Sequence, residues 1–343
     1  MEAEPLDERR ARVLRAVVQD HIRTGEPVGS RAVAELYRLR VSPATIRNDM
    51  AALERMGYLT HPHTSAGRIP TDLGYRFYVD TLPGLPKLAD SRRRTITEHI
   101  DDRITDIEEL MRRTAQVLSR TTHYAAVALP PVRTRQALAR VDLVPVATGA
   151  LLLAVTESGR VDRRMLETDA DEQTLERVRG SISEQLTGLS LEEASLRADV
   201  LAGVASERER AILSAVARAL ETFDDEEQHV FIGGVGNIAG EEAFEHRDTL
   251  RQLFQALDEE ASILRFLRVL AEEGEALTVR IGRENPLPAM REASVVLATY
   301  ELEGQPVGTI AVIGPTRMQY PDAMSTVNAV SRRLSRVIES LGT

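Results

Sequence analysis

The feature that most constrains the fold is a run of three short helices and a hairpin near the start of the chain. Apolar residues at helical spacing predict the helices between residues 7 and 56. Ser42-Pro43 supplies an N-cap and a proline at the first position of the third helix, and Gly57 suits a left-handed cap at its end. Turn and β-forming residues over 58–69 favour a hairpin. This order of elements predicts a winged helix-turn-helix, a DNA-binding motif.

The third helix is the predicted reading helix, which would lie in the major groove of DNA. Ile46, Met50 and Leu53 are expected to face the core of this small domain. The opposite face suits base recognition, because arginine can pair with guanine and asparagine with adenine. The predicted DNA-contacting residues are Ser42, Ala44, Thr45, Arg47, Asn48 and Arg55 in or before the helix, and His63, Gly67 and Arg68 in the hairpin. A surface helix with solvated polar residues is the alternative interpretation.

The hairpin residues have separate predicted roles. Gly67 is expected to permit an unusual backbone conformation, and Arg68 stands where a wing can reach the minor groove. His61 and His63 lie two residues apart, but two histidines without cysteines or paired carboxylates are a weak metal signal. We therefore expect this segment to contact DNA and to bind no metal.

The distribution of charge agrees with a DNA-binding head on an acidic chain. The whole sequence has a formal net charge of −10, which by itself disfavours contact with phosphate. Residues 30–70, however, contain six arginines and three acidic residues, a local excess of three positive charges. A basic head on an acidic body permits DNA binding without general adhesion to polyanions.

The composition argues against enzymatic chemistry. Without cysteine, the chain has no disulfides, thiolate metal sites or cysteine nucleophiles. Gly234-Val235-Gly236 imitates a dinucleotide-binding motif, but no acidic residue ends a strand about 20 residues later. We therefore disfavour a nicotinamide-dependent oxidoreductase and expect no enzyme activity and no cofactor. Gly314 to Arg317 could border a small-molecule pocket, although a structural turn is the favoured interpretation.

A cytoplasmic location is expected, without association with a membrane. The first residues lack the charged and apolar regions of a signal peptide. The most apolar stretch, 141–155, is too short to span a bilayer and contains Asp142 and Pro145.

Beyond the predicted head, the kind of secondary structure that the sequence predicts changes twice. A linker is expected at 83–90 and one long helix at about 91–120. Strands, then helices, then strands again predict an α+β fold with a mainly helical insertion. The predicted domains are the winged helix-turn-helix at 1–82, the α+β domain in two parts at 91–168 and 226–343, and the insertion at 169–225.

Five runs of sequence carry a resemblance to a known family. They are SPATIRNDM at 42–50, PHTSAGRIPT at 62–71, GYRFYVD at 74–80, IGREN at 281–285 and IGPTRMQY at 313–320. Together they closely resemble the heat-inducible transcription repressors of the HrcA family. The resemblance implies that the α+β domain is GAF-like and that its insertion is a dimerising domain.

The same resemblance implies a function and two protein partners. A homodimer would bind an inverted-repeat operator upstream of chaperone operons. The GroEL chaperonin would help the repressor to fold, so heat, which diverts GroEL to damaged proteins, would lower repression. We expect charge substitutions at Leu220 and Phe223 to give monomers, with the predicted helix at 100–118 as the alternative interface. The alternative function is a transcription regulator with a metabolite pocket in its GAF-like domain.

Overall fold

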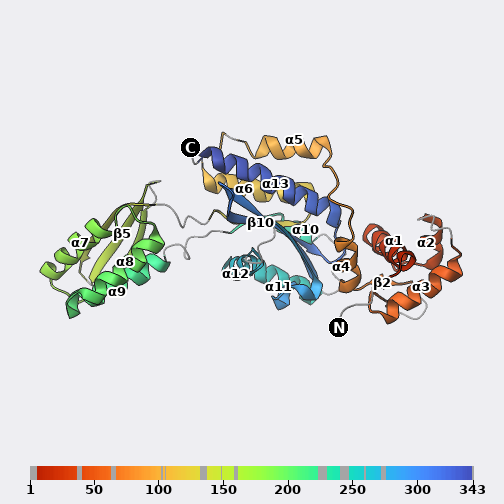
Figure 1. Ribbon diagram of the computed structural model, residues 1–343, viewed down its shortest axis with the longest axis horizontal. Coiled ribbons are helices and arrows are strands. Elements are labelled where there is room, and N and C mark those ends of the chain that lie inside the picture. Colours follow the sequence, from red (N-terminus) through yellow and green to blue (C-terminus); the bar gives the residue numbers. More distant parts are fainter. Residues whose placement is uncertain are drawn as a thin grey trace. The chain divides into compact units, whose positions relative to one another are not determined.

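The computed structural model describes a mixed α+β protein with antiparallel sheets. The described residues are 6–36, 41–62, 67–101, 103–104, 106–131, 137–147, 149–157, 161–222, 230–239, 247–258, 260–271 and 276–341. Contacts divide the chain into two compact units (Figure 1). One unit is formed by Met1–Pro130 and His229–Thr343, and the other by Pro131–Gln228.

The first unit begins with a head of four helices and one short hairpin. Its elements are α1 (Glu8–Thr24), α2 (Ser30–Leu36), α3 (Pro43–Arg55), β1 (Leu59–Thr60), β2 (Ile69–Pro70) and α4 (Asp72–Asp80). The hydroxyl of Ser42 accepts a hydrogen bond from the Thr45 amide at 3.1 Å, as expected of an N-cap. Gly57 has φ +81° after α3, the left-handed conformation predicted there. Leu59 and Pro70 are register partners in the antiparallel hairpin.

A five-stranded antiparallel sheet forms the body of the first unit. Its order is β7 (Phe231–Gly233), β3 (Ala125–Ala128), β10 (Gln305–Pro315), β9 (Ala293–Leu302) and β8 (Leu277–Ile281). Alternate residues of β10 enter different cores, with Ile310 and Val312 on one face and Ala311 and Ile313 on the other. Helices α6 (Ile107–Thr122) and α13 (Tyr320–Leu341) cover the first face, and α11 (Arg247–Asp258) and α12 (Glu260–Ala271) cover the second (Figure 1).

The second unit is a three-stranded antiparallel sheet packed with three helices. Its elements are β4 (Leu138–Val146), β5 (Gly149–Thr156), β6 (Val161–Leu166), α7 (Glu172–Leu186), α8 (Leu191–Val204) and α9 (Glu207–Thr222). Leu152 from the sheet shares a buried cluster with Ile182, Ala198 and Val216 from the three helices. This unit therefore has its own core.

The predicted boundary of the insertion at 169 is wrong. Strands β4, β5 and β6 belong to the second unit, because their buried residues cluster with α7–α9 and not with the five-stranded sheet. Both connections within this small sheet are local antiparallel hairpins, so the strands need no partner from the rest of the chain. The inserted unit is thus α+β and not mainly helical.

The predicted single helix at 91–120 is also wrong, because the chain forms two helices there. Helix α5 (Asp90–His99) ends at Ile100, whose φ of −107° and ψ of 77° are not helical. Helix α6 starts afresh after Asp106, whose carboxylate accepts a hydrogen bond from the Glu108 amide at 3.0 Å. Ile96 before the break, Ile100 at it and Ile104 after it are all buried, so the apolar four-residue spacing continues through the break.

The residues predicted for the dimer interface need correction. Leu220 is only 1% exposed and lies in the core of the second unit, so a charge there would disrupt folding. Phe223 lies outside the described residues. In the alternative region, Leu110 and Leu118 are buried in the core of the first unit. None of the helices within the described ranges is both long and apolar enough to cross a bilayer.

Candidate nucleic-acid interface

Helix α3 is fixed to the head by a buried carboxylate as well as by apolar packing. Ile46 and Leu53 are fully buried on its inner face. Asp49 is 3% exposed and accepts two hydrogen bonds from the Arg9 guanidinium of α1, at 2.8 Å from Nε and 2.9 Å from Nη2. Such a bidentate pair fixes rotation as well as position. Sequence reasoning missed Asp49, although a carboxylate on the apolar stripe of a helix was an available signal.

The predicted reading residues of α3 lie together on its outer face. Ser42, Ala44, Arg47, Asn48 and Arg55 are exposed, and Thr45 is half-buried. Within the described part of the chain, the side chains of Arg47, Asn48 and Arg55 have no hydrogen bond or ion pair. These side chains are therefore available to a ligand.

The start of α3 is organised around Ser42 and Thr45. The Ser42 hydroxyl lies 3.0 Å from the Thr45 hydroxyl, in addition to accepting the Thr45 amide. Ser42 is therefore partly engaged in the cap of the helix. The positive end of the helix dipole lies at this exposed point, and it favours a negatively charged group such as phosphate.

Arg68 in the hairpin is paired with a carboxylate of α3. Its Nε donates to Glu54 Oε2 at 2.8 Å, and the other Glu54 oxygen contacts Nδ1 of His61. Partial burial raises the pKa of Glu54, but the hydrogen bonds and charges of His61 and Arg68 outweigh it and hold that pKa below its ordinary value. Arg68 is 26% exposed, so its charge is shared between Glu54 and solvent. His63 lies outside the described residues.

Gly67 is required for close packing and not for an unusual backbone angle. It is absent from the described glycines with positive φ, so that expectation is wrong. A Cβ there would lie 2.5 Å from the carbonyl oxygen of Val28. Next to it, Arg68 and Val28 exchange backbone hydrogen bonds of 2.8 and 2.9 Å. Gly67 thus lets the hairpin pair with the segment before α2.

The glycine-rich turn that imitates a nucleotide-binding loop is closely packed. Gly234 has φ +68°, and a Cβ there would clash with Ser119 of α6. Asn237 donates from Nδ2 to the Ser119 hydroxyl at 2.9 Å. The turn joins β7 to the short helix α10 (Val235–Ala239), and its side chains tie it to α6.

Comparison with known proteins gives the family. A model of the HrcA protein C-terminal domain matches residues 108–324. The heat-inducible transcription repressor HrcA of Moorella thermoacetica is 39% identical over 344 residues, which cover 98% of this chain and 99% of that protein. The repressor of the same name from Thermobifida fusca is 38% identical over 340 residues, covering 97% of each chain. The chain belongs to the HrcA family of heat-inducible transcription repressors.

Membership of the HrcA family confirms the resemblance found in the five sequence motifs. The HrcA domain match covers most of the body and the inserted unit, whereas the full-length relatives also cover the head. A solved structure described as a hypothetical protein has the same fold, with a TM-score of 0.66 and 26% identity over 98% of this chain and all of that one. The relatives are named as transcription repressors and not as enzymes.

Proposed function

We propose that this HrcA-family chain represses heat-shock chaperone operons by binding an inverted-repeat operator in double-stranded DNA. The proposal rests on the difference between the two faces of α3. Its inner face is buried and braced by Asp49, and its outer face presents Arg47, Asn48 and Arg55 to solvent. We assign the head as a winged helix-turn-helix and the five-stranded body as GAF-like.

The proposed contacts divide by chemistry. Arg47, Asn48 and Arg55 are assigned to base edges, and Ala44 is small enough to permit close approach. Ser42, Thr45, His63, Gly67 and Arg68 are assigned to the DNA backbone or the minor groove.

Selection from a random DNA library tests this function, because the selection itself identifies the operator sequence. The full-length protein is expected to enrich an inverted repeat and to bind it at least a thousandfold more tightly than a scrambled duplex. An enriched pool without two-fold symmetry would contradict the inverted-repeat operator. Equal affinity for selected and scrambled DNA would contradict sequence-specific repression altogether.

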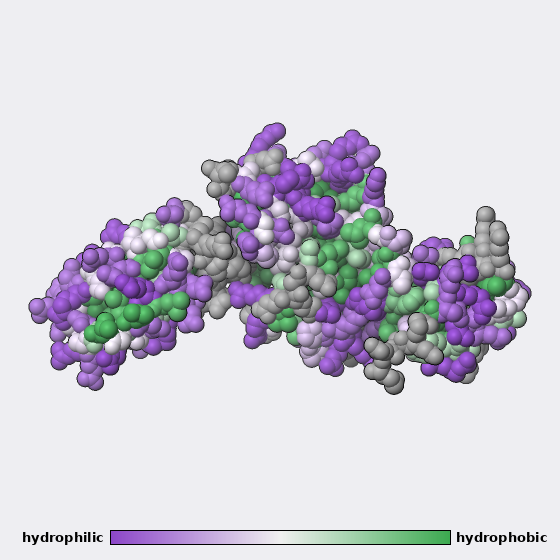
Figure 2. All heavy atoms as spheres, in the orientation of Figure 1, coloured by the Kyte–Doolittle hydropathy of each residue, from purple (hydrophilic) through white to green (hydrophobic). Residues whose placement is uncertain are grey.

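We infer that the functional form is a homodimer formed through α8 of the inserted unit. Leu196, Val200 and Val204 recur at four-residue spacing and are 63%, 60% and 84% exposed. The opposite face of α8 is buried in the unit through Ala194, Ala198 and other small residues. Apolar surface on this unit is visible in Figure 2. A second copy suits this stripe, because a two-fold operator requires a two-fold protein and the stripe can pair with itself.

Val200→Glu is expected to give a folded monomer with weakened operator binding, because a buried charge at the centre of the stripe opposes pairing. Light scattering measures the oligomeric state of the variant, and circular dichroism shows whether it is folded. The matched control is Met165→Glu on β6, which is 50% exposed on the same unit but away from α8. If Met165→Glu gives monomers and Val200→Glu does not, the small sheet and not α8 forms the interface.

We also propose that GroEL-assisted folding sets the amount of active repressor. The topology supports this proposal, because β3 must pair with β10, although 181 residues of chain separate Ala128 from Ile310 (310 − 128 − 1). The inserted unit folds within that interval. Long loop closure slows folding and exposes unpaired apolar strands, the property of a chaperonin client.

A metabolite-responsive regulator is the second candidate, and one groove favours it. The groove, of about 340 Å³, lies between the linker at 85–88, α5 and α13. Its cations are Lys87, Arg93, Arg332, Arg333 and Arg336, and no acidic residue lines it within the described part of the chain. An anionic metabolite suits this lining. A rise in Tm with ATP that is lost in Arg332→Ala would favour this candidate, and unchanged Tm would reject it.

A further inference from the structure

The two motifs near the end of the sequence meet the DNA-binding head. The run at 281–285 begins at the last residue of β8, and the run at 313–320 joins β10 to α13. Both runs lie in the body of the first unit, about 200 residues or more after α4. Each nevertheless contacts the head directly, at α4 or at the end of α1.

Arg76 of α4 makes a two-point contact with Glu284. Its Nε donates to Glu284 Oε1 at 2.8 Å, and Nη2 donates to the other carboxylate oxygen. Nη2 also donates to the carbonyl oxygen of Val279 in β8 at 2.6 Å. Both side chains are about one quarter exposed. The Glu284 carboxylate is itself fixed, because it accepts the amide of Ile281 at 2.9 Å.

Asp72, at the start of α4, binds the same turn. Its carboxylate accepts the backbone amide of Arg283 at 3.1 Å. Gly282 has φ +55°, and a Cβ there would clash with the Asp72 carboxylate. The glycine of this motif is therefore needed both for its backbone angle and for the approach of the head.

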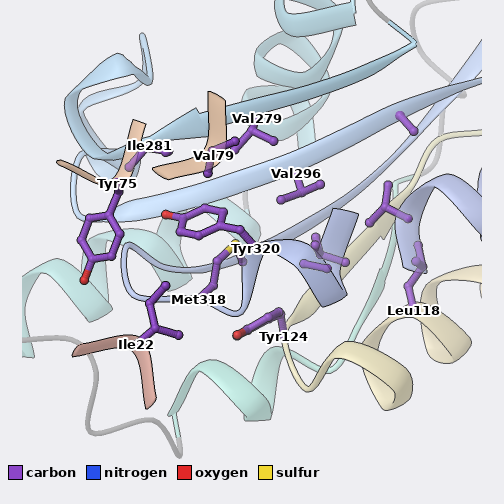
Figure 3. Packing of buried hydrophobic residues seen from close by; sticks show 14 of the residues in the cluster. Ile22, Tyr75, Val79, Leu118, Tyr124, Val279, Ile281, Val296, Met318 and Tyr320 are labelled. Carbon is purple, nitrogen blue, oxygen red and sulfur yellow. The ribbon is translucent and has the colours of Figure 1, made fainter. Parts of the chain in front are cut away.

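The second motif contacts the head through packing and through Arg317. Tyr320 is fully buried, and its ring lies 6.1 Å from that of Tyr75 in α4. Figure 3 shows Ile22 of α1 and Met318 in the same cluster. Gly25 ends α1 with φ +74°, and a Cβ there would lie 2.6 Å from Nη1 of Arg317. A guanidinium at the negative end of α1 is electrostatically favourable.

We propose that Arg76 and Glu284 are positioning residues that hold the head on the body and so narrow the range of operator half-site spacings that a dimer accepts. This inference rests on the proposed DNA-binding function. Because α1 carries both the brace to α3 and the contacts with the second motif, the head and the body move together. Within each protomer, the position of the reading helix is then set by the body, and not by the linker at 83–90. A dimer whose heads cannot shift on their bodies accepts a narrower range of half-site separations than one whose heads are free to move.

The experiment compares operators whose central spacer is lengthened or shortened by one base pair. Wild-type protein is expected to lose about tenfold or more in affinity for either altered spacer, because only one head can then bind without strain. Glu284→Gln and Arg76→Lys are expected to bind the native operator about tenfold more weakly than wild type. When the spacer is altered, the loss in log affinity of either variant should be less than half of the loss that the wild-type protein shows. Affinity for an isolated half-site should be unchanged.

Arg92→Ala is the matched control, because Arg92 forms an exposed ion pair with Asp322 that does not involve the head. It should keep the wild-type spacing preference. Circular dichroism establishes that each variant is folded, and Asp72→Asn provides a second, milder change at the same junction. A wild-type spacing profile in the folded Arg76 and Glu284 variants overturns the proposal. Failure of the wild-type protein to bind any half-site would instead overturn the proposed function.

Discussion

At the scale of single residues, the pairing of Arg68 with Glu54 changes what Arg68 can contribute to DNA binding. A free arginine in the hairpin would release about one counterion from DNA. In this head the guanidinium already donates to Glu54, and the carboxylate also contacts His61. DNA must therefore compete with Glu54 for Arg68. The negative charge of Glu54 additionally opposes an approaching phosphate.

Arg68→Ala should have its full electrostatic effect only after Glu54 has been neutralised. In a Glu54→Gln background, we expect Arg68→Ala to reduce the slope of log affinity against log salt concentration by about 0.9. In the wild-type background the reduction should be clearly smaller. Anisotropy titrations at several salt concentrations measure both slopes. Equal effects in the two backgrounds would mean that Glu54 does not restrain Arg68 in the complex.

The residues that could be predicted are those controlled by local periodicity. The outward placement of Arg47, Asn48 and Arg55 follows from helical spacing and the buried positions of Ile46 and Leu53. The pair between Arg68 and Glu54 was not predictable in the same way. Its partners are 14 residues apart, and their meeting depends on the geometry of the hairpin.

At the scale of elements, α3 depends on α1 through the ion pair between the buried Asp49 and the half-exposed Arg9. Asp49 has 4% of its side-chain surface exposed, whereas Arg9 has 47%. Removal of Asp49 leaves Arg9 as a partly solvated cation. The expected loss in the free energy of unfolding is therefore that of a charged hydrogen bond, and not that of an isolated buried charge.

Asp49→Ala should lower the free energy of unfolding by about 1–3 kcal/mol. It should also weaken operator binding, because α3 loses its fixed rotation on α1. Asp322→Ala is the control, since its exposed pair with Arg92 should contribute less than about 1 kcal/mol. Urea unfolding compares the two variants. Equal stability of Asp49→Ala and Asp322→Ala would show that the brace contributes little.

The helices and strands were easier to predict than the elements with which they pair or pack. The helices between residues 7 and 56 and the hairpin over 58–69 were predicted close to their observed bounds, because helix and turn signals depend on neighbouring side chains. The membership of β4–β6 in the second unit was missed, since strand periodicity does not specify which sheet a strand joins. The pair of Arg76 and Glu284 spans 208 residues, and no local pattern predicts it.

At the scale of the whole molecule, two parts of the chain must meet around an inserted unit. The central strand β10 pairs with β3 from before the insertion and with β9 from after it. The sheet is therefore complete only when almost all of the chain is available. Incomplete or partly unfolded chains expose the apolar strands of this sheet, and heat increases their population.

Refolding should consequently depend on the chaperonin. After dilution from denaturant, we expect GroEL with ATP to raise the fraction of protein that binds operator by several-fold. GroEL without ATP is the control, because it can bind unfolded chains without releasing them. Complete and rapid spontaneous refolding up to heat-shock temperatures would contradict control by folding and would favour the metabolite-responsive candidate.

The central claim is that the outer face of α3 reads operator DNA. Its most direct test is an anisotropy titration of wild type, Arg47→Ala and Asn48→Ala against the selected operator and a scrambled duplex. Each substitution should weaken operator binding by about 1–3 kcal/mol and leave binding to the scrambled duplex nearly unchanged. Arg94→Ala, an exposed arginine of α5, should change neither affinity. Wild-type affinity for the operator in both α3 variants would contradict the account.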